Sequence, residues 1–310
     1  MKKVIVLLSS YNGEKYIEEQ VSTVLNQEDV IVKLLIRDDG SQDSTLDIVK
    51  KLCINSNNIE LIEGTNVGCA QSFLLLMKEA LKRENEYDYI SFCDQDDFWM
   101  KDKLKCAIEK LSQHNDEKPF IYFSNLYIVD KELHNKRRMY DSIDCYLNKA
   151  HLLVENFATG CTMVFNKGAL KSFFRYPIEN LRVHDIRLFH MCLFLGDYYY
   201  DDTPHILYRQ HSDNVIGANY YKKQRIKSKL RSLRTFWKQH LREEEAMEIL
   251  SSYGEEMSQE DKRLVKVVAF YRECLKYRLI LFFAPGDYKF KLRRLSDNFW
   301  FKVRIILGAV

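Results

Sequence analysis

The sequence predicts an α/β fold: a mostly parallel sheet with helices on both faces, followed by a helical, basic C-terminal region. Three observations lead to this prediction. Short apolar runs alternate with helix-periodic segments over the first 125 residues, polar or acidic residues follow each apolar run, and Lys and Arg gather after residue 218. With 46% hydrophobic and 29% charged residues, the composition is that of a globular protein and excludes disordered and collagen-like chains.

The first part of the chain alternates predicted strands with predicted helices. Val4–Leu8 is a wholly apolar run, which is typical of a strand buried on both faces. Apolar residues between Tyr16 and Leu25 instead recur at the spacing of one helix face. The same patterns predict strands at 30–36, 59–62 and 89–93, and helices at 44–53, 73–80 and 103–111. Strands separated by helices in this order form a parallel sheet.

The rest of the chain divides into a less regular part and a helical part. Further strands are expected at 120–127, 161–165 and 206–209, and helical patterns dominate from about residue 219. Ser44, with Asp47 three residues later, resembles a capping box at the start of the second helix. We therefore expect one domain over residues 1–217 and a helical region over 218–310.

Charge is unevenly divided between these two parts. Residues 219–310 carry 21 Lys and Arg against 11 Asp and Glu, whereas residues 1–218 carry 26 against 33. From Lys222 to Arg242 the basic residues alternate with apolar ones at helical spacing, which suits a membrane interface. The alternative is a set of helices that pack on the rest of the protein and keep their basic faces in water. Nucleic-acid binding is not expected, because no recognised binding module accompanies the charge.

The cysteines and the N-terminus point to a reducing compartment. None of the eight cysteines forms a C-x-x-C pair, so a zinc cluster is not expected. The apolar run after Met1 is too short for a secretory signal, and no stretch approaches the length of a spanning helix. We expect reduced thiols and a cytoplasmic location.

The sharpest cluster of chemical groups is Asp94-Gln95-Asp96-Asp97, directly after the fourth predicted strand. Ligands bind beyond the carboxyl ends of parallel strands, and carboxylate oxygens suit Mg²⁺ or Mn²⁺. The alternative is a pair of acidic caps on the following helix. We favour metal and nucleotide binding, because a second acidic pair, Asp38-Asp39, follows another strand.

Three further groups are candidates. An Asp in the Asp38-Asp39-Gly40-Ser41 segment can accept a hydrogen bond from a base or ribose, although an Asp-Gly turn is the simpler interpretation. Asp185, next to His184, is a possible general base or a helix cap. His211, within Tyr208–Asn214, is a possible metal ligand or a structural histidine.

In combination these motifs resemble the family 2 inverting glycosyltransferases of GT-A (Rossmann-like) fold. The resemblance is to the bacterial group that builds O-antigen, lipopolysaccharide, capsule and rhamnan polysaccharides. The segments that resemble the motifs of this family are Leu8–Tyr16, Arg37–Ser41, Asn66–Gly68, Asp94–Trp99, His184-Asp185 and Tyr208–Gly217. The chain departs from many relatives at Gln71, on the side of the nucleotide base, and at Ile186-Arg187.

The resemblance implies a role for each matching residue. Asp185 would be the catalytic base, Asp96 would hold the metal, and His211 would approach that metal from the far side. The nucleotide would be bound by Ser10, Tyr11, Asp38, Asp39, Asn66, Gly68, Asp94 and Gln95. The pocket for sugar and acceptor would be lined by Asp97, Trp99, His184, Arg209 and Asn214.

The reaction implied by the resemblance is a single displacement with inversion. A UDP- or dTDP-sugar would be the donor, Mn²⁺ or Mg²⁺ the cofactor, and a lipid-linked (polyprenyl diphosphate) glycan the acceptor. The protein would be peripheral on the cytoplasmic face of the bacterial inner membrane. Two rivals are a nucleotidyltransferase, disfavoured by the acidic, Gly-poor loop after the first strand, and a non-catalytic scaffold that binds sugar nucleotides.

Overall fold

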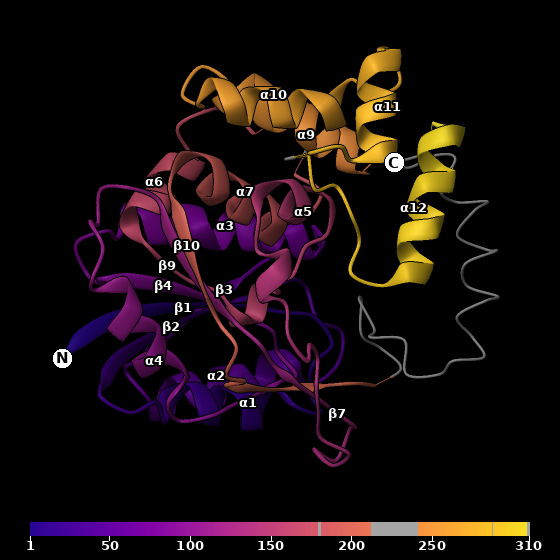
Figure 1. Ribbon diagram of the computed structural model, residues 1–310. Coiled ribbons are helices and arrows are strands. Elements are labelled where there is room, and N and C mark those ends of the chain that lie inside the picture. The colour runs from indigo at the N-terminus through magenta and orange to yellow at the C-terminus, as the bar shows by residue number, and fades with distance from the viewer. Residues whose placement is uncertain (179–180, 212–240, 287, 309–310) are drawn as a thin grey trace. The chain divides into compact units, whose positions relative to one another are not determined.

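The computed structural model describes residues 1–178, 181–211, 241–286 and 288–308 (Figure 1). These residues belong to two compact units. The first comprises residues 1–141, 158–192 and 196–213, and the second comprises 142–157, 193–195 and 214–310. The expected boundary at residue 217 and the predicted amphipathic helix of Lys222–Arg242 lie in or next to residues 212–240, outside the described residues, so both stay predictions.

A seven-stranded sheet forms the centre of the first unit, in the order β10-β6-β9-β4-β1-β2-β3. All neighbours are parallel except β9, which runs antiparallel to both β4 and β6. The strands are β1 (Lys2–Ser10), β2 (Val30–Asp38), β3 (Ile59–Glu63), β4 (Tyr89–Cys93), β6 (Phe120–Ser124), β9 (Val164–Asn166) and β10 (Asp197–Asp201). Strands β1 and β4 are almost wholly buried, as their apolar runs predict.

Helices cover both faces of this sheet. Figure 1 shows α1 (Ile17–Leu25), α2 (Thr45–Asn55) and α4 (Lys103–Leu111) on one face, and α3 (Cys69–Lys82), α6 (Lys167–Phe173) and α7 (His184–Leu195) on the other. Each buries the apolar stripe that its periodicity indicates, for example Phe73, Leu76 and Met77 of α3. The predicted α/β class with a mostly parallel sheet is confirmed.

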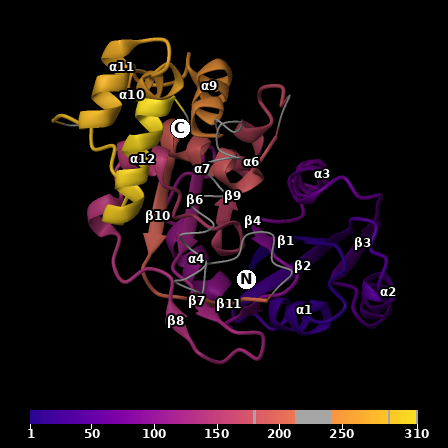
Figure 2. The ribbon, with the colours of Figure 1, turned by 90° about the vertical axis from the view of Figure 1, so that its right-hand side faces the viewer.

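A second, four-stranded sheet follows the order β5-β11-β7-β8 (Figure 2). Its strands are β5 (Phe98–Trp99), β7 (Tyr127–Val129), β8 (Arg137–Arg138) and β11 (Ile206–Arg209). Strand β11 pairs antiparallel with β5 and parallel with β7. This pairing brings the segment after β4 next to the segment after β11, although about a hundred residues separate them.

The second unit is helical. It contains α5 (Lys149–Val154), α9 (Leu241–Tyr253), α10 (Gln259–Ala269), α11 (Leu275–Phe283) and α12 (Leu295–Leu307), together with a short 3-10 turn at Asp144–Tyr146. The Ser258 hydroxyl caps α10 by accepting a hydrogen bond from the Asp261 backbone N–H at 3.0 Å. Lys149 pairs with Asp261 at 2.8 Å, which ties α5 to α10.

Two local expectations can be compared directly with the structure. The capping box at Ser44 is wrong: the Ser44 side chain makes no cap hydrogen bond, and its backbone N–H instead donates to Glu14 at 2.9 Å. Across the described ranges, no helix combines the length and apolar character that crossing a membrane requires.

Candidate active site

The candidate site lies where β1, β2 and β4 end. Ser10 stands opposite Asp38 in the β1–β2 register, and Leu8 stands opposite Cys93, the residue before Asp94. The segments that follow these three strands therefore meet at one edge of the sheet, as parallel strands require.

Asp38 organises the turn after β2. Its carboxylate is buried and accepts hydrogen bonds from the Ser10 hydroxyl at 3.0 Å, the Ser41 hydroxyl at 2.6 Å and the Ser41 backbone N–H at 2.9 Å. These bonds connect the ends of β1 and β2. Ser10 is buried beside Asp38, and the roles of both residues in nucleotide binding stay predictions.

Asp39 holds the turn that leads into α3. Its buried carboxylate forms an ion pair with Arg37 and accepts from the backbone N–H groups of Val67 at 3.0 Å and Gly68 at 2.9 Å. Gly68 has a φ of +83°, which favours glycine because a side chain there would be strained. Asn66 is exposed in the same turn. Binding of a pyrimidine by Asp39 stays a prediction.

Gln95 fixes the loop after β1. Its side-chain amide donates to the Tyr11 carbonyl at 3.0 Å and accepts from the Tyr11 backbone N–H at 2.9 Å. The Tyr11 ring is 42% exposed and so is available to a ligand. Gln95 thus positions Tyr11 instead of presenting a free amide.

The acidic segment after β4 contains carboxyl groups in unlike surroundings. Burial, together with the charges of Asp96 and Asp185, raises the pKa of Asp94 to about 7. Asp97 is fully buried, and burial also raises its pKa well above the usual range. One Asp97 oxygen accepts from the Arg209 backbone N–H at 3.2 Å, while Oδ2 is buried without a well-formed hydrogen bond from any described residue.

Asp96 and His211, the two predicted metal ligands, lie side by side, and their role as ligands stays a prediction. His211 Nε2 lies 2.8 Å from Asp96 Oδ2, and the His211 ring packs 5.2 Å from that of Tyr16. Nearby, the ligand atoms of Asp94, Asp97 and Cys161 all lie within 4.8 Å of one another. Crowded carboxylates and an imidazole are a donor set that fits a divalent cation such as Mn²⁺ or Mg²⁺.

The alternative interpretation of Asp94 and Asp96 as helix caps is not supported. Strand β5 follows the acidic segment, and Asp102 occupies the N-cap position of α4. Asp94 and Asp96 are therefore not placed to satisfy the first backbone N–H groups of that helix.

Asp185 lies in the first turn of α7 and is half-buried. Its Oδ2 accepts from the Gly160 backbone N–H at 3.0 Å, and its Oδ1 accepts from the Ile186 N–H at 2.8 Å. A Cβ at residue 160 would lie 3.0 Å from the same Oδ2, so glycine permits this close approach. The backbone thus fixes the orientation of the carboxylate.

The pKa of the Cys69 thiol, at the start of α3, depends on several of these carboxylates. Close packing, and then the charges of Asp94, Asp185 and Asp39, raise the pKa of the thiol to about 12. The predicted base, the first Asp of the acidic segment and the predicted nucleotide ligand therefore all lie near enough to this thiol for their charges to act on it.

Four residues expected to line the substrate pocket are instead packed supports. Asp97 is buried, as described above, and Trp99 is buried with the Lys103 ammonium 3.5 Å from its ring centre. His184 stacks on Phe73 at 4.0 Å, and burial lowers its pKa. The corrections share one cause, which is contact with residues distant in sequence: Arg209 for Asp97, Ile206 for Trp99 and Phe73 for His184.

Arg209 is the fourth of these supports. Its guanidinium donates to the Asp96 carbonyl at 2.8 Å and to the Lys131 carbonyl at 2.6 Å, and it pairs with Glu19. It therefore holds the backbone of the acidic segment. Asn214, the remaining residue predicted for the pocket, lies outside the described residues.

Sequence reasoning missed several residues of this site. Arg37 could have been found, because a charged residue near the end of a buried strand needs a buried partner. Cys161, Gly160 and Glu19 carry no comparable local signal, since only the tertiary structure brings them to the site.

Comparison with known proteins agrees with this architecture. The sequence profile described as Glycosyl transferase family 2 matches residues 5–179. The dTDP-rhamnosyl transferase RfbG of Shigella flexneri is 34% identical over 226 residues, covering 68% of this chain and 74% of that protein. The UDP-Glc:alpha-D-GlcNAc-diphosphoundecaprenol beta-1,3-glucosyltransferase WfaP of Escherichia coli is 31% identical over 134 residues, covering 41% of this chain and 47% of that protein.

Solved structures agree on the fold. The crystal structure of Staphylococcus aureus TarS 1–349 in complex with UDP-GlcNAc matches with a TM-score of 0.60 at 18% identity, covering 92% of this chain and 80% of that one. Together with the sequence matches, this places the chain in a family. The chain belongs to glycosyl transferase family 2, and it is a glycosyltransferase of GT-A fold from the group that serves bacterial polysaccharide synthesis.

Proposed function

We propose that the chain is an inverting glycosyltransferase of O-antigen or capsule synthesis, with a UDP- or dTDP-sugar as donor and a hydroxyl of a lipid-linked glycan as acceptor. One observation carries this proposal. Asp94 and Asp39 follow β4 and β2 at one edge of the sheet, the charge of Asp185 raises the pKa of Asp94, and the charges of all three act on the Cys69 thiol. This reaction needs three groups within reach of one sugar: a general base, ligands for the metal and diphosphate, and a turn that binds the nucleoside.

Asp185 acts as the general base in this proposal. It takes the proton of the acceptor hydroxyl as that oxygen attacks the anomeric carbon, and the nucleoside diphosphate leaves from the opposite side with inversion. The Gly160 and Ile186 backbone N–H groups hold the carboxylate in place before the acceptor arrives. No protein nucleophile is required.

Asp96 and His211 would hold a divalent ion, Mn²⁺ or Mg²⁺, and Asp94 lies close enough for the Asp96 charge to raise its pKa. When bound, such an ion offsets the negative charge of a leaving diphosphate. Arg209 supports the same segment because its guanidinium donates a hydrogen bond to the Asp96 backbone carbonyl.

The names of the relatives support the substrate classes. RfbG is named as a dTDP-rhamnosyl transferase, WfaP acts on a diphosphoundecaprenol-linked acceptor, and the TarS structure contains UDP-GlcNAc. A dTDP- or UDP-sugar and a polyprenyl diphosphate acceptor follow as the first substrates to test. An acceptor of this kind stays in a bilayer, so we place the enzyme peripherally on the cytoplasmic face of the inner membrane.

The test compares Asp185→Asn with wild type in two assays. In the first, UDP and dTDP are added with Mn²⁺ or with chelator, and thermal stabilisation measures nucleotide binding; a nucleotide at a hundred times its Kd adds about 2.7 kcal/mol. In the second, release of nucleoside diphosphate measures turnover. We expect the variant to keep nucleotide binding and to lose turnover by about 10²–10⁴-fold.

The matched control is Asp29→Asn, an exposed carboxylate at a φ of +58°, which asparagine also adopts readily. It should leave both assays unchanged. If Asp185→Asn kept full turnover, Asp185 would not be the general base. Nucleotide binding with no turnover in the wild type would favour a scaffold, and release of pyrophosphate would favour a nucleotidyltransferase.

A further inference from the structure

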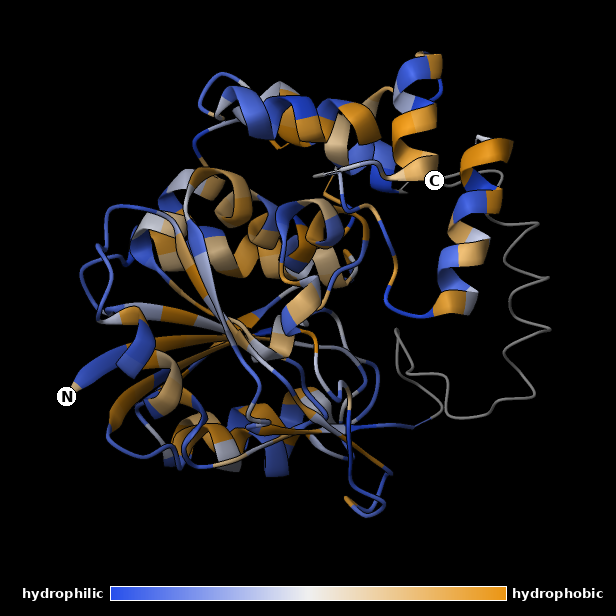
Figure 3. Cartoon of the chain, viewed as in Figure 1, coloured by the Kyte–Doolittle hydropathy of each residue, from blue (hydrophilic) through white to orange (hydrophobic). Residues whose placement is uncertain are grey.

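Exposed apolar side chains gather on two helices of the second unit. On α11, Leu275 is 70% and Phe283 65% exposed; on α12, Leu295 is 88% and Phe299 62% exposed. Figure 3 shows the strongly hydrophobic residues along both helices. Scattered single apolar residues on a surface are ordinary, whereas a cluster of this size marks a contact surface.

The spacing of these residues puts them on one face of each helix. Leu275, Leu279 and Phe283 recur every fourth residue on α11, where they line a groove with Ile280 and Pro285. On α12, Leu295, Phe299 and Ile306 follow a comparable helical spacing. Other faces supply Leu281 of α11 and Ile305 of α12 to the interior, so both helices already use another face for packing within the unit.

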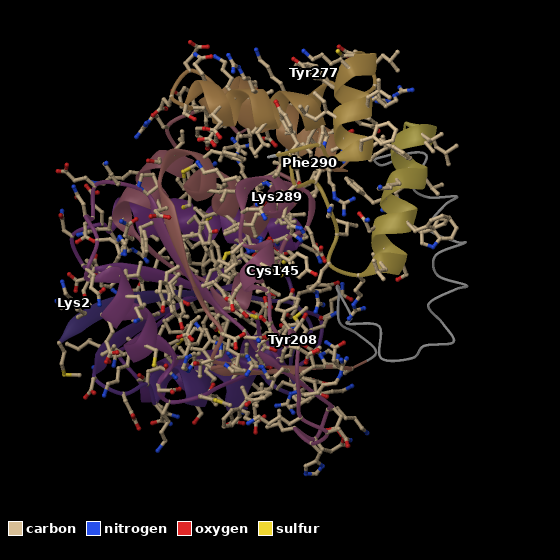
Figure 4. All side chains as sticks on the ribbon, in the orientation of Figure 1. Lys2, Cys145, Tyr208, Tyr277, Lys289 and Phe290 are labelled. Atoms are coloured by element: carbon tan, nitrogen blue, oxygen red, sulfur yellow. The ribbon has the colours of Figure 1, made fainter. Side chains whose placement is uncertain are left out.

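Cations accompany these apolar residues along the chain, and Lys276 lines the α11 groove itself. Lys276, Lys289, Lys291 and Arg294 are exposed, and none of them forms an ion pair with a described acid. Phe290, which lies between Lys289 and Lys291 in the sequence, is buried and anchors the segment that joins α11 to α12, while both lysines are exposed. Figure 4 labels Lys289 and Phe290 on this segment. Residues 275–308 contain eight Lys and Arg against two Asp.

We propose that this surface of α11 and α12, defined by Leu275, Leu279, Phe283, Leu295, Phe299 and Ile306 and bordered by these cations, binds an anionic lipid bilayer. Apolar side chains between cations match the acyl boundary and the acidic headgroups of such a surface. A second copy of the chain is a poorer occupant, because a symmetric dimer would set cations against cations. The inference extends the proposed membrane location and does not depend on the sugar chemistry.

The test is flotation of the full chain with vesicles of phosphatidylcholine, with and without phosphatidylglycerol. The apolar variant carries Leu275→Ser, Phe283→Ser and Phe299→Ser, and the charge variant carries Lys276→Gln, Lys289→Gln and Lys291→Gln. Because these side chains are exposed, the helices should still fold. Wild type should float with the anionic vesicles, and each variant should bind them at least about tenfold more weakly.

Matched controls change the same residue types in the first unit. Ile54→Ser with Ile31→Ser removes exposed apolar groups, and Lys51→Gln, Lys78→Gln and Lys101→Gln remove exposed charges. Both control sets should float like wild type. Stabilisation by UDP or dTDP should be the same in every variant, so a failed lipid contact is distinguishable from a failed donor site.

Three results would overturn the inference. If the wild-type protein does not float with anionic vesicles, it has no such lipid-binding surface. Variants that float as well as wild type would place the contact elsewhere, for example in 222–242. A wild-type dimer that the apolar variant converts to monomer, measured by light scattering after gel filtration, would identify the occupant as a second copy.

Discussion

Replacing Arg37 by methionine tests how the turn that leads into α3 is held. The Arg37 and Asp39 side chains are only 5% and 3% exposed, and the guanidinium also donates to the Thr65 carbonyl at 3.0 Å and the Ser72 hydroxyl at 3.1 Å. Methionine keeps much of the side-chain volume but leaves the Asp39 carboxylate buried without its counter-charge. The expected effect is a large loss of stability at a site next to the proposed ligand.

The magnitude follows from the burial of the pair. Removing one partner of a buried ion pair costs about 3–5 kcal/mol. Asp39 keeps its bonds from the Val67 and Gly68 backbone N–H groups, so we expect the lower end, about 3 kcal/mol. For a domain of this size, such a loss lowers Tm by roughly 6–12 °C.

Urea unfolding of three variants checks this reasoning. Lys33→Met, which removes the surface pairs with Glu60 and Glu86, should cost about 0–1 kcal/mol. Adding Asp39→Asn to Arg37→Met should recover about 1 kcal/mol or more, because no unpaired charge is then buried. If Arg37→Met cost no more than Lys33→Met, the buried pair would not be what holds the turn.

Three further outcomes are expected. Asp96→Ala should abolish the Mn²⁺-dependent part of stabilisation by UDP or dTDP, while Asp29→Ala keeps it; equal metal dependence in both would exclude Asp96 as a ligand. Gly160→Ala should lower turnover by about tenfold or more with nucleotide binding unchanged, because the new methyl would displace the Asp185 carboxylate; normal turnover would show that this contact is unimportant. Burial by itself lowers the pKa of His205, but the carboxylates of Asp201 and Asp102 raise this pKa above its usual value. A histidine whose pKa is raised in the folded state stabilises the protein fully below its unfolded pKa of about 6.5, and this stabilisation is lost as pH rises through the folded pKa. The stability advantage of wild type over His205→Gln should therefore shrink from about pH 6 to about pH 8. A difference in stability that does not change with pH would contradict this.

Local periodicity predicted the elements of the first unit well. The helix expected at 103–111 has those bounds in the structure, and the strand expected at 89–93 does as well. The rule that ligands bind beyond the ends of parallel strands then located the site edge, where Ser10, Asp38 and Asp94 meet. These features depend on residues close in sequence and on one general property of parallel sheets.

Other features were beyond such reasoning because they depend on distant contacts. Strand β9 inserts antiparallel between β4 and β6, and the two-residue strand β5 exists only because β11 pairs with it. Trp99, His184 and Arg209 have residue types that suit a sugar pocket. Their burial depends on contacts with Ile206, Phe73 and Glu19 respectively, whose proximity no local pattern indicates.

The β5–β11 pairing also separates early from late events in folding. The turns around Ser10, Asp38 and Gly68 arise from successive strand–helix–strand crossovers and can form while the rest of the chain is still being synthesised. Asp96 and His211 are 115 residues apart and meet only after β11 has joined the small sheet. Closing so long a loop is slow relative to local pairing. If this pair holds an ion as proposed, metal affinity should appear only when the first unit is complete, and a nascent chain that has formed the turns after β1 and β2 would still lack it.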